Sequence, residues 1–153
     1  MSEDFAKADA CTQAAWIQNK EVSPRELVDA AIDRIESGNP ELNAVILPAF
    51  EKARERASDP NLPDGPFRGV PFLMKDLGGE EAGQPHHLGM AVLKEAKWVE
   101  PTDSHYARRA REAGLISLGR TNTPEIGLCP VTEPEAYGPT RSPWNTDHSA
   151  GGS

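Results

Sequence analysis

Two segments of the chain contain residue types that could share one chemical task. Residues 69–76 include an apolar run that ends on Lys75, and residues 149–153 read Ser-Ala-Gly-Gly-Ser. Taking an ammonium group out of water disfavours its charge, so a lysine at the end of a buried strand can act as a general base. The paired glycines allow backbone conformations that could turn the Ser153 hydroxyl and several N–H groups toward a reacting carbonyl. Together the segments indicate proton transfer between a lysine and a serine.

Neither segment is specific when it is taken alone. Most lysines at strand ends keep the charge in water while the stem lies along apolar surface, and Lys75 could pair there with the adjacent Asp76. A run of glycine and serine is also typical of a flexible terminus. The periodicity of the chain leaves both alternatives open.

Helical patterns dominate the first third of the chain. One helix is predicted over residues 9–19. A second begins at Ser23, which can form a capping box with Glu26, and Gly38 is expected to end it. The pattern then indicates a strand, a helix and a loop, at residues 43–47, 50–57 and 59–66.

Two apolar runs predict neighbouring strands of one sheet. Residues 70–74 are continuously apolar, as in a strand that is covered on both faces. A helix capped by Thr102 or Asp103 separates this run from the second, at residues 115–118. A strand, a helix and a strand at this spacing indicate a right-handed crossover between parallel strands. Residues 76–100 show little periodicity and are expected to form a long loop, which is typically functional or mobile.

Composition excludes several classes of function. The 153 residues are 37% hydrophobic and 26% charged, which is typical of one soluble globular domain. A formal net charge of -8 argues against nucleic acid or an acidic membrane as a partner. The apolar runs are too short to span a membrane, and the N-terminus lacks the features of a secretory signal. Cys11 and Cys129 match no metal-binding spacing, and we interpret them as free thiols of a cytoplasmic protein.

Four motifs follow one another in a characteristic order. They are residues 69–77, 119–125 (Gly-Arg-Thr-Asn-Thr-Pro-Glu), 138–145 (Gly-Pro-Thr-Arg-Ser-Pro-Trp-Asn) and 149–153 (Ser-Ala-Gly-Gly-Ser). In this order they resemble the amidase signature family, and a weaker resemblance extends to the N-terminal helices. The resemblance implies an α/β fold in which a mixed sheet has helices on both faces. It further implies that residues 1–153 are the N-terminal part of a single amidase domain, with a mainly helical lead-in at 1–58 and the start of the catalytic core at 69–153.

The same resemblance implies hydrolysis of carbon–nitrogen amide bonds by a Ser-cisSer-Lys triad. Lys75 matches the lysine of this triad, and Ser153 matches the serine that relays a proton from the nucleophilic serine to the lysine. The nucleophile of the family lies in a later Gly/Ser loop, so we expect the 153-residue chain alone to be inactive. Two alternatives stay open, an inactive or partner-binding remnant and the A subunit of glutamyl-tRNA amidotransferase. Lys-Asp-Leu at residues 75–77 favours the stand-alone amidases and a small carboxamide substrate.

Further site residues follow from the resemblance. Leu128 and Cys129 correspond to a segment that lines the acyl pocket, although Cys129 could equally be a buried cysteine that packs as a small hydrophobe. Support of the serine loop is expected from Gly151, Gly152, Thr140 and Asn145.

The remaining polar and aromatic features are given structural roles. Trp144 is expected to pack in the core, and His86 and His87 are expected to be surface residues, because adjacent histidines cannot easily share one ion. The resemblance implies no metal and no organic cofactor. A half-built sheet would expose an unpaired strand edge, which favours homo-oligomers or another association.

Overall fold

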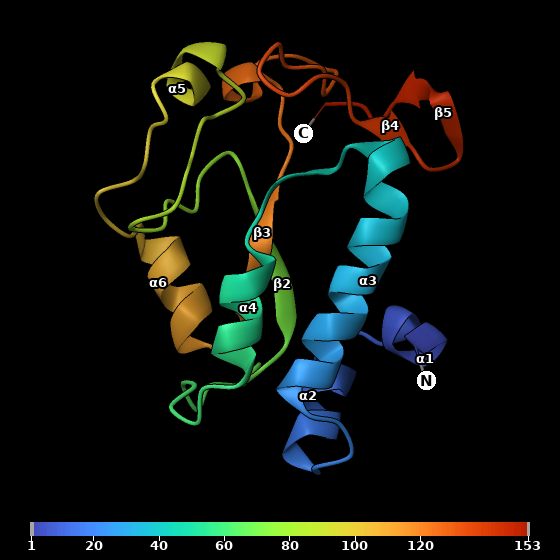
Figure 1. Cartoon of the computed structure of the whole chain (residues 1–153), viewed down its shortest axis with the longest axis vertical. Coiled ribbons are helices and arrows are strands. Elements are labelled where there is room, and N and C mark those ends of the chain that lie inside the picture. The colour runs from blue at the N-terminus through green and yellow to red at the C-terminus, as the bar shows by residue number, and fades with distance from the viewer. Residues whose placement is uncertain (1, 153) are drawn as a thin grey trace.

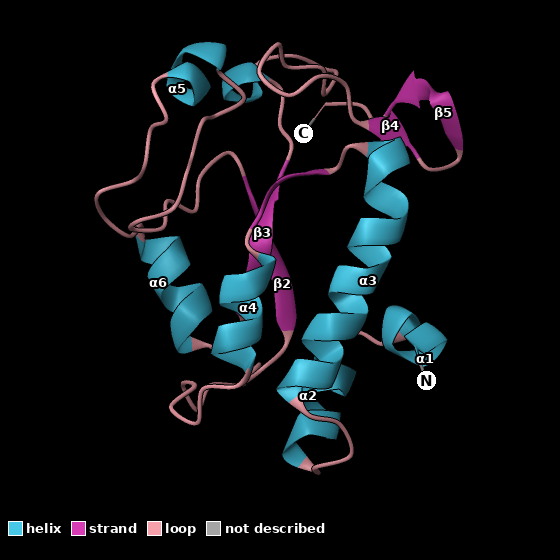
Figure 2. Cartoon of the chain, viewed as in Figure 1, coloured by secondary structure: helices cyan, strands magenta, loops and turns pink. Residues whose placement is uncertain are grey.

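The computed structural model describes residues 2–152, so Ser153 lies outside the described residues. The chain forms a small α/β unit in which helices surround a short central sheet (Figures 1 and 2). The helices are α1 (Ser2–Lys7), α2 (Ala10–Gln18), α3 (Pro24–Leu42), α4 (Phe50–Ala57), α5 (Ala91–Glu95) and α6 (His105–Glu112), and a 3₁₀ turn, η1, covers Glu125–Gly127.

The central sheet is mixed, as expected from the sequence. Its three strands are β1 (Val45–Pro48), β2 (Pro71–Lys75) and β3 (Ile116–Thr121), arranged in the order β1-β3-β2. The β2 and β3 strands run parallel, whereas β1 is antiparallel to β3. A separate hairpin joins β4 (Arg141–Ser142) to β5 (Asn145–Ser149).

The core lies where α3 and α4 pack on the middle strand. Figure 1 shows α4 in front of β2 and β3, with α3 and α6 on opposite sides of it. The apolar residues of this cluster come from both helices, from β3 and from the loop after α4: Val28, Ala31, Ile32, Ala53, Ala57, Leu62, Ile116 and Leu118. Because the first helices and the third strand share one core, residues far apart in the sequence fold as one unit.

The prediction for the start of α3 is confirmed, and the prediction for its end is wrong. The Ser23 and Glu26 side chains form the capping box. The helix continues through Gly38 and Pro40 and ends at Leu42, because Asn43 takes the left-handed conformation with a φ of 51°. Tertiary hydrogen bonds compensate for the weak helix formers in the last turns.

Two further expectations need correction. Ser104, and not Thr102 or Asp103, caps α6 by accepting a hydrogen bond from the Ala107 amide. Asp103 instead accepts two hydrogen bonds from the Arg111 guanidinium. The β2 strand is less buried than expected for a strand that is covered on both faces, since Met74 is its one buried residue and its other residues are half-buried.

Candidate active site

The backbone around Lys75 is fixed at the end of β2. Lys75 pairs with Thr121 on the parallel strand β3, and the amide of Asp76 donates to the Thr121 carbonyl at 3.0 Å. The Lys75 carbonyl accepts a hydrogen bond from Nη1 of Arg120 at 3.0 Å. The lysine side chain is half-buried. The sheet therefore sets the point from which this side chain leaves the backbone.

Asp76 orders the loop that follows the strand. Its carboxylate is fully buried and accepts hydrogen bonds from the amides of His87 at 2.9 Å and Gly89 at 3.0 Å. A buried carboxylate with two backbone donors is well satisfied without a cation. Within residues 2–152, the alternative of a surface pair between Asp76 and Lys75 is not observed.

His86 and His87 are buried, so their assignment to the surface was wrong. Nδ1 of His86 lies 2.9 Å from a carboxylate oxygen of Glu100. Nδ1 of His87 contacts the Tyr137 hydroxyl, and the two rings stack with their centroids 6.0 Å apart. Burial lowers the pKa of the His87 imidazole below 6.5. These contacts connect the loop after Lys75 with the segment around Tyr137.

Thr140 joins three segments near the end of β3. Its hydroxyl donates to the Asn43 carbonyl at 2.8 Å and accepts from Nδ2 of Asn122 at 3.0 Å. Its backbone amide donates to Thr132, and its carbonyl accepts from Ala150. Asn122 directly follows the strand residue that pairs with Lys75. The arrangement thus connects the lysine strand with the Gly/Ser segment through one buried threonine.

The Gly/Ser segment rests against the residues around Cys129. The Gly151 carbonyl accepts a hydrogen bond from the Thr132 hydroxyl at 2.7 Å. A Cβ atom on Gly152 would lie 2.5 Å from the Cys129 carbonyl oxygen, so this close approach requires glycine. The described part of the segment is therefore held against a neighbouring loop by specific contacts.

Other proposed site residues are more exposed. Leu128 is 79% exposed, and Cys129 is an exposed free thiol, so the alternative of a buried cysteine is wrong. Asn145 lies exposed on β5 and accepts a hydrogen bond from the Asp147 amide. Trp144 is 94% exposed and does not pack in the core, because it lies at the turn of the β4–β5 hairpin. Ser153 falls outside the described residues.

The structure brings some of the proposed residues together and leaves others apart. Thr140, Gly151, Gly152 and the Cys129 backbone form one contact network, to which Lys75 is joined through β3. The contact between buried His87 and half-buried Tyr137 was not predicted from the sequence. The sequence shows only that His87 is a titratable residue in the stretch that follows Asp76. Its partner Tyr137 lies 50 residues further along the chain, so local pattern cannot reveal the contact.

Residues 2–152 contain no group of three or more His, Cys, Asp or Glu side chains that could hold a metal ion. None of the described helices combines the length and apolar character that crossing a bilayer requires.

Comparison with known proteins identifies the class of this fold and site. The family model described as Amidase matches residues 26–153, which is most of the chain. The chain belongs to the amidase family, whose members are the amidase signature enzymes.

Several relatives in this family are named as hydrolases or amidases. The chain is 45% identical over 145 residues to a 6-aminohexanoate-cyclic-dimer hydrolase of Paenarthrobacter ureafaciens, covering 95% of this chain and 29% of the relative. A solved structure of a 6-aminohexanoate cyclic dimer hydrolase matches with a TM-score of 0.89 and 44% identity, over 95% of this chain and 30% of the other. A bacterial aryl acylamidase matches with a TM-score of 0.86 and 38% identity, over 95% and 31%. The chain thus spans about a third of the length of these relatives.

Proposed function

We propose that this sequence is part of an enzyme that hydrolyses the carbon–nitrogen bond of small carboxamides through a Ser-cisSer-Lys triad. The observation that carries the proposal is the link between the Lys75 strand end and the Gly/Ser segment, made by hydrogen bonds from Asn122 to Thr140 and from Ala150 to Thr140. A lysine base and a serine relay must come within hydrogen-bond distance for proton transfer, and a link between the segments that carry them supports this assignment.

Lys75 and Ser153 are assigned successive roles in this proposal. Lys75 takes the proton of the Ser153 hydroxyl while Ser153 takes the proton of the nucleophilic serine. The serine oxygen attacks the amide carbon, the carbon–nitrogen bond breaks and the proton passes to the leaving amine. Water then releases the acid from the acyl-enzyme. The 153 residues hold the base and the relay, and the nucleophile belongs to sequence beyond Ser153.

A small carboxamide is the substrate class that the residues favour over tRNA-bound glutamate. Lys-Asp-Leu at residues 75–77 and Thr-Asn-Thr-Pro-Glu-Ile at residues 121–126 resemble the stand-alone amidases. The relatives named above, a cyclic-dimer hydrolase and an aryl acylamidase, support the same choice. Leu128 and Cys129 are proposed to contact the acyl group from their exposed loop once the rest of the enzyme covers them.

A chimera tests the proposal. This chain would replace the homologous first part of the Paenarthrobacter cyclic-dimer hydrolase, and release of the amine would be followed on the cyclic dimer. The chimera should be active, and Lys75→Ala should lower kcat by about a thousandfold or more because the proton acceptor is lost. Lys7→Ala, an exposed change in α1, is the matched control and should leave kcat unchanged.

Two outcomes would contradict the proposal. An active chimera that is insensitive to Lys75→Ala would remove Lys75 from the mechanism. Amide hydrolysis by the purified 153-residue chain, abolished by Lys75→Ala, would show that no further nucleophile is needed.

A further inference from the structure

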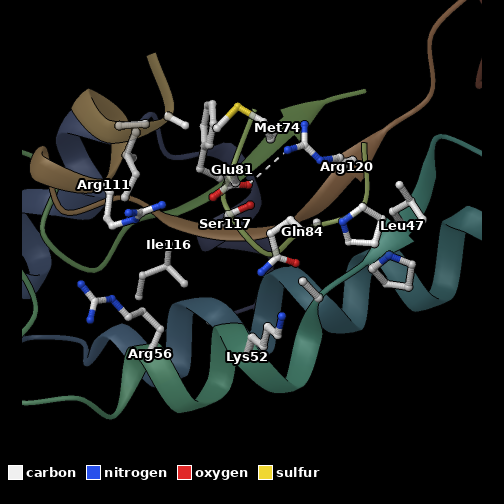
Figure 3. Close-up of a pocket in the computed structure, with 18 of the residues that line it drawn as sticks. Leu47, Lys52, Arg56, Met74, Glu81, Gln84, Arg111, Ile116, Ser117 and Arg120 are labelled. Carbon is white, nitrogen blue, oxygen red and sulfur yellow. Dashed lines mark ion pairs between the residues drawn. The ribbon is translucent and has the colours of Figure 1, made fainter. Parts of the chain in front are cut away.

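A cavity of about 300 Å³ lies between α4, α6 and the central sheet, and the proposed mechanism does not use it. Figure 3 shows this α4–α6 cavity in close-up. One part of its wall is apolar and includes Leu47, Met74 and Ile116. The other part is cationic and is formed by Lys52, Arg56, Arg111 and Arg120. Glu81 is the carboxylate among the lining residues.

Two of the four cations already have carboxylate partners at the rim. Arg56 donates to Asp59 at 2.8 Å, and Arg111 donates to both oxygens of Asp103 at 2.7 Å and 2.9 Å. Lys52 is exposed on α4, and Figure 3 shows its side chain pointing into the cavity. Lys52 is therefore the cation of this wall that has no carboxylate partner among the described residues, and Arg120, which pairs with Glu81 at 3.8 Å, lies further in.

Arg120 forms the inner end of the cationic wall and is only 2% exposed. Its two terminal nitrogens donate to the carbonyls of Lys75 and Gly79, and one of them lies 3.8 Å from a carboxylate oxygen of Glu81. Its Nε has no acceptor among residues 2–152. A buried donor without an acceptor is costly, and it indicates an acceptor that comes from outside the chain.

The buried charges limit how much negative charge this wall can accept. Burial is the main influence on both Arg120 and Glu81, lowering the pKa of the guanidinium and raising that of the carboxyl group. Glu81, Asp76, Glu100 and Glu80 all act on the charge of Arg120, so the guanidinium already has anionic neighbours. A ligand anion would therefore depend on Lys52 and on the Nε hydrogen-bond donor of Arg120.

We propose that the α4–α6 cavity binds a small organic carboxylate, with its acid group between Lys52 and Arg120 and its apolar body against Met74 and Ile116. A cavity that joins apolar walls to convergent charged groups is typical of a small-molecule site. A single negative charge fits better than a dianion, because Glu81 would repel the second charge. Arg120 also holds the Lys75 carbonyl, so a bound anion would act directly on the strand that carries Lys75. The site does not depend on amide hydrolysis.

Fluorine NMR on the full 153-residue chain tests this site, with 4-fluorobenzoate as the probe. Binding is expected with a Kd of about 1 mM, and Lys52→Gln should weaken it about two- to fivefold. Glu81→Gln should tighten binding by a similar factor, because it removes the repelling carboxylate. Lys20→Gln, an exposed change outside the cavity lining, is the matched control and should leave Kd unchanged.

Three results would overturn the proposal. Equal binding of 4-fluorobenzyl alcohol would show that the cavity selects an aromatic body and not an acid. An equal effect of Lys20→Gln and Lys52→Gln would show that the attraction is diffuse. Absence of binding by a chain whose circular dichroism is native would rule out the site itself.

Discussion

Buried His87 contacts half-buried Tyr137, and this contact ties the loop after Lys75 to the segment before Thr140. The imidazole lies next to the tyrosine hydroxyl, and Lys94 lies over the tyrosine ring at 4.4 Å from its centroid. Burial is the main cause that lowers the pKa of His87, the charge of Lys94 acts in the same direction, and the Asp76 carboxylate opposes them. The net effect favours the neutral imidazole in the folded protein.

This environment predicts a pH dependence of stability. Burial lowers the pKa of His87 below 6.5, so below about pH 6.5 the unfolded chain takes up the proton more readily than the folded chain. The free energy of unfolding is expected to fall as the pH drops from about 7.5 to about 5.5. His87→Gln should reduce this fall, as measured by urea denaturation at several pH values.

His148→Gln provides the control for that measurement. His148 is exposed on β5, and its loss should leave the pH dependence unchanged. An unaltered slope for His87→Gln would mean that this histidine does not link proton uptake to unfolding.

Residue environments could be predicted from the sequence only where local pattern decides them. The end of an apolar strand placed Lys75 correctly on the sheet. The burial of His86 and His87 depends on Glu100 and on Tyr137, which are distant in sequence. The exposure of Trp144 depends on a hairpin turn that the apolar pattern does not encode.

At the scale of elements, the two ends of α3 are determined in different ways, one by neighbouring residues and the other partly by distant ones. Its start is set by the capping box of Ser23 and Glu26, which lie three residues apart. At its end the Asn39 side chain accepts from the amides of Ala44 and Val45, and Asn43 donates to Tyr137 and Pro139. The capping box could be predicted, whereas the distant carbonyls that extend the helix beyond Gly38 could not.

A substitution in the capping box tests whether neighbouring residues stabilise the start of α3. Ser23→Ala should lower the free energy of unfolding by about 1 kcal/mol, because the Glu26 amide loses its acceptor. Urea denaturation monitored by circular dichroism measures the change. Ser37→Ala, an exposed change inside the same helix, should have no effect or stabilise by up to about 0.5 kcal/mol. Equal losses for the two variants would show that the box contributes nothing specific.

The whole molecule contains a sheet with open edges. The β2 strand is one edge, and a second cavity of about 360 Å³ lies between it and α3. Phe72, Leu73, Ile35 and Leu42 are among the apolar residues that line this cavity. An unpaired edge next to apolar surface favours pairing with another chain.

We therefore expect the 153-residue chain to associate as its concentration rises. Sedimentation velocity should show a weight-average sedimentation coefficient that increases with concentration. Phe72→Lys should reduce the increase, because it places a charge on the edge strand at a half-buried position next to the cavity. Trp144→Ser removes an exposed aromatic ring on the distant hairpin and should leave association unchanged. If Trp144→Ser reduced association and the edge-strand variant did not, the hairpin would be the surface through which the chains associate.

The family of the whole molecule could be predicted because the order of its motifs is visible in the sequence, without knowledge of how the helices and strands pack. Residues 69–77 and the three later motifs indicated the amidase family, and the family model covers residues 26–153. The two apolar runs and the crossover predicted the parallel pair of β2 and β3, and the family resemblance implied the mixed sheet. The two cavities could not be predicted, since they depend on how helices pack on the strands.

The hydrogen bonds of Asn43 also bear on the order in which the protein takes shape during synthesis. Its side chain reaches the Tyr137 carbonyl, 94 residues further along the chain. The first turns of α3 can form as soon as they leave the ribosome, because their cap is local. The last turn has a local cap as well, from Asn39, but the hydrogen bonds that Asn43 makes to Tyr137 and Pro139 can form only after those residues have been made. A growing chain therefore completes the contacts at this helix end only when the Gly/Ser segment is about to emerge.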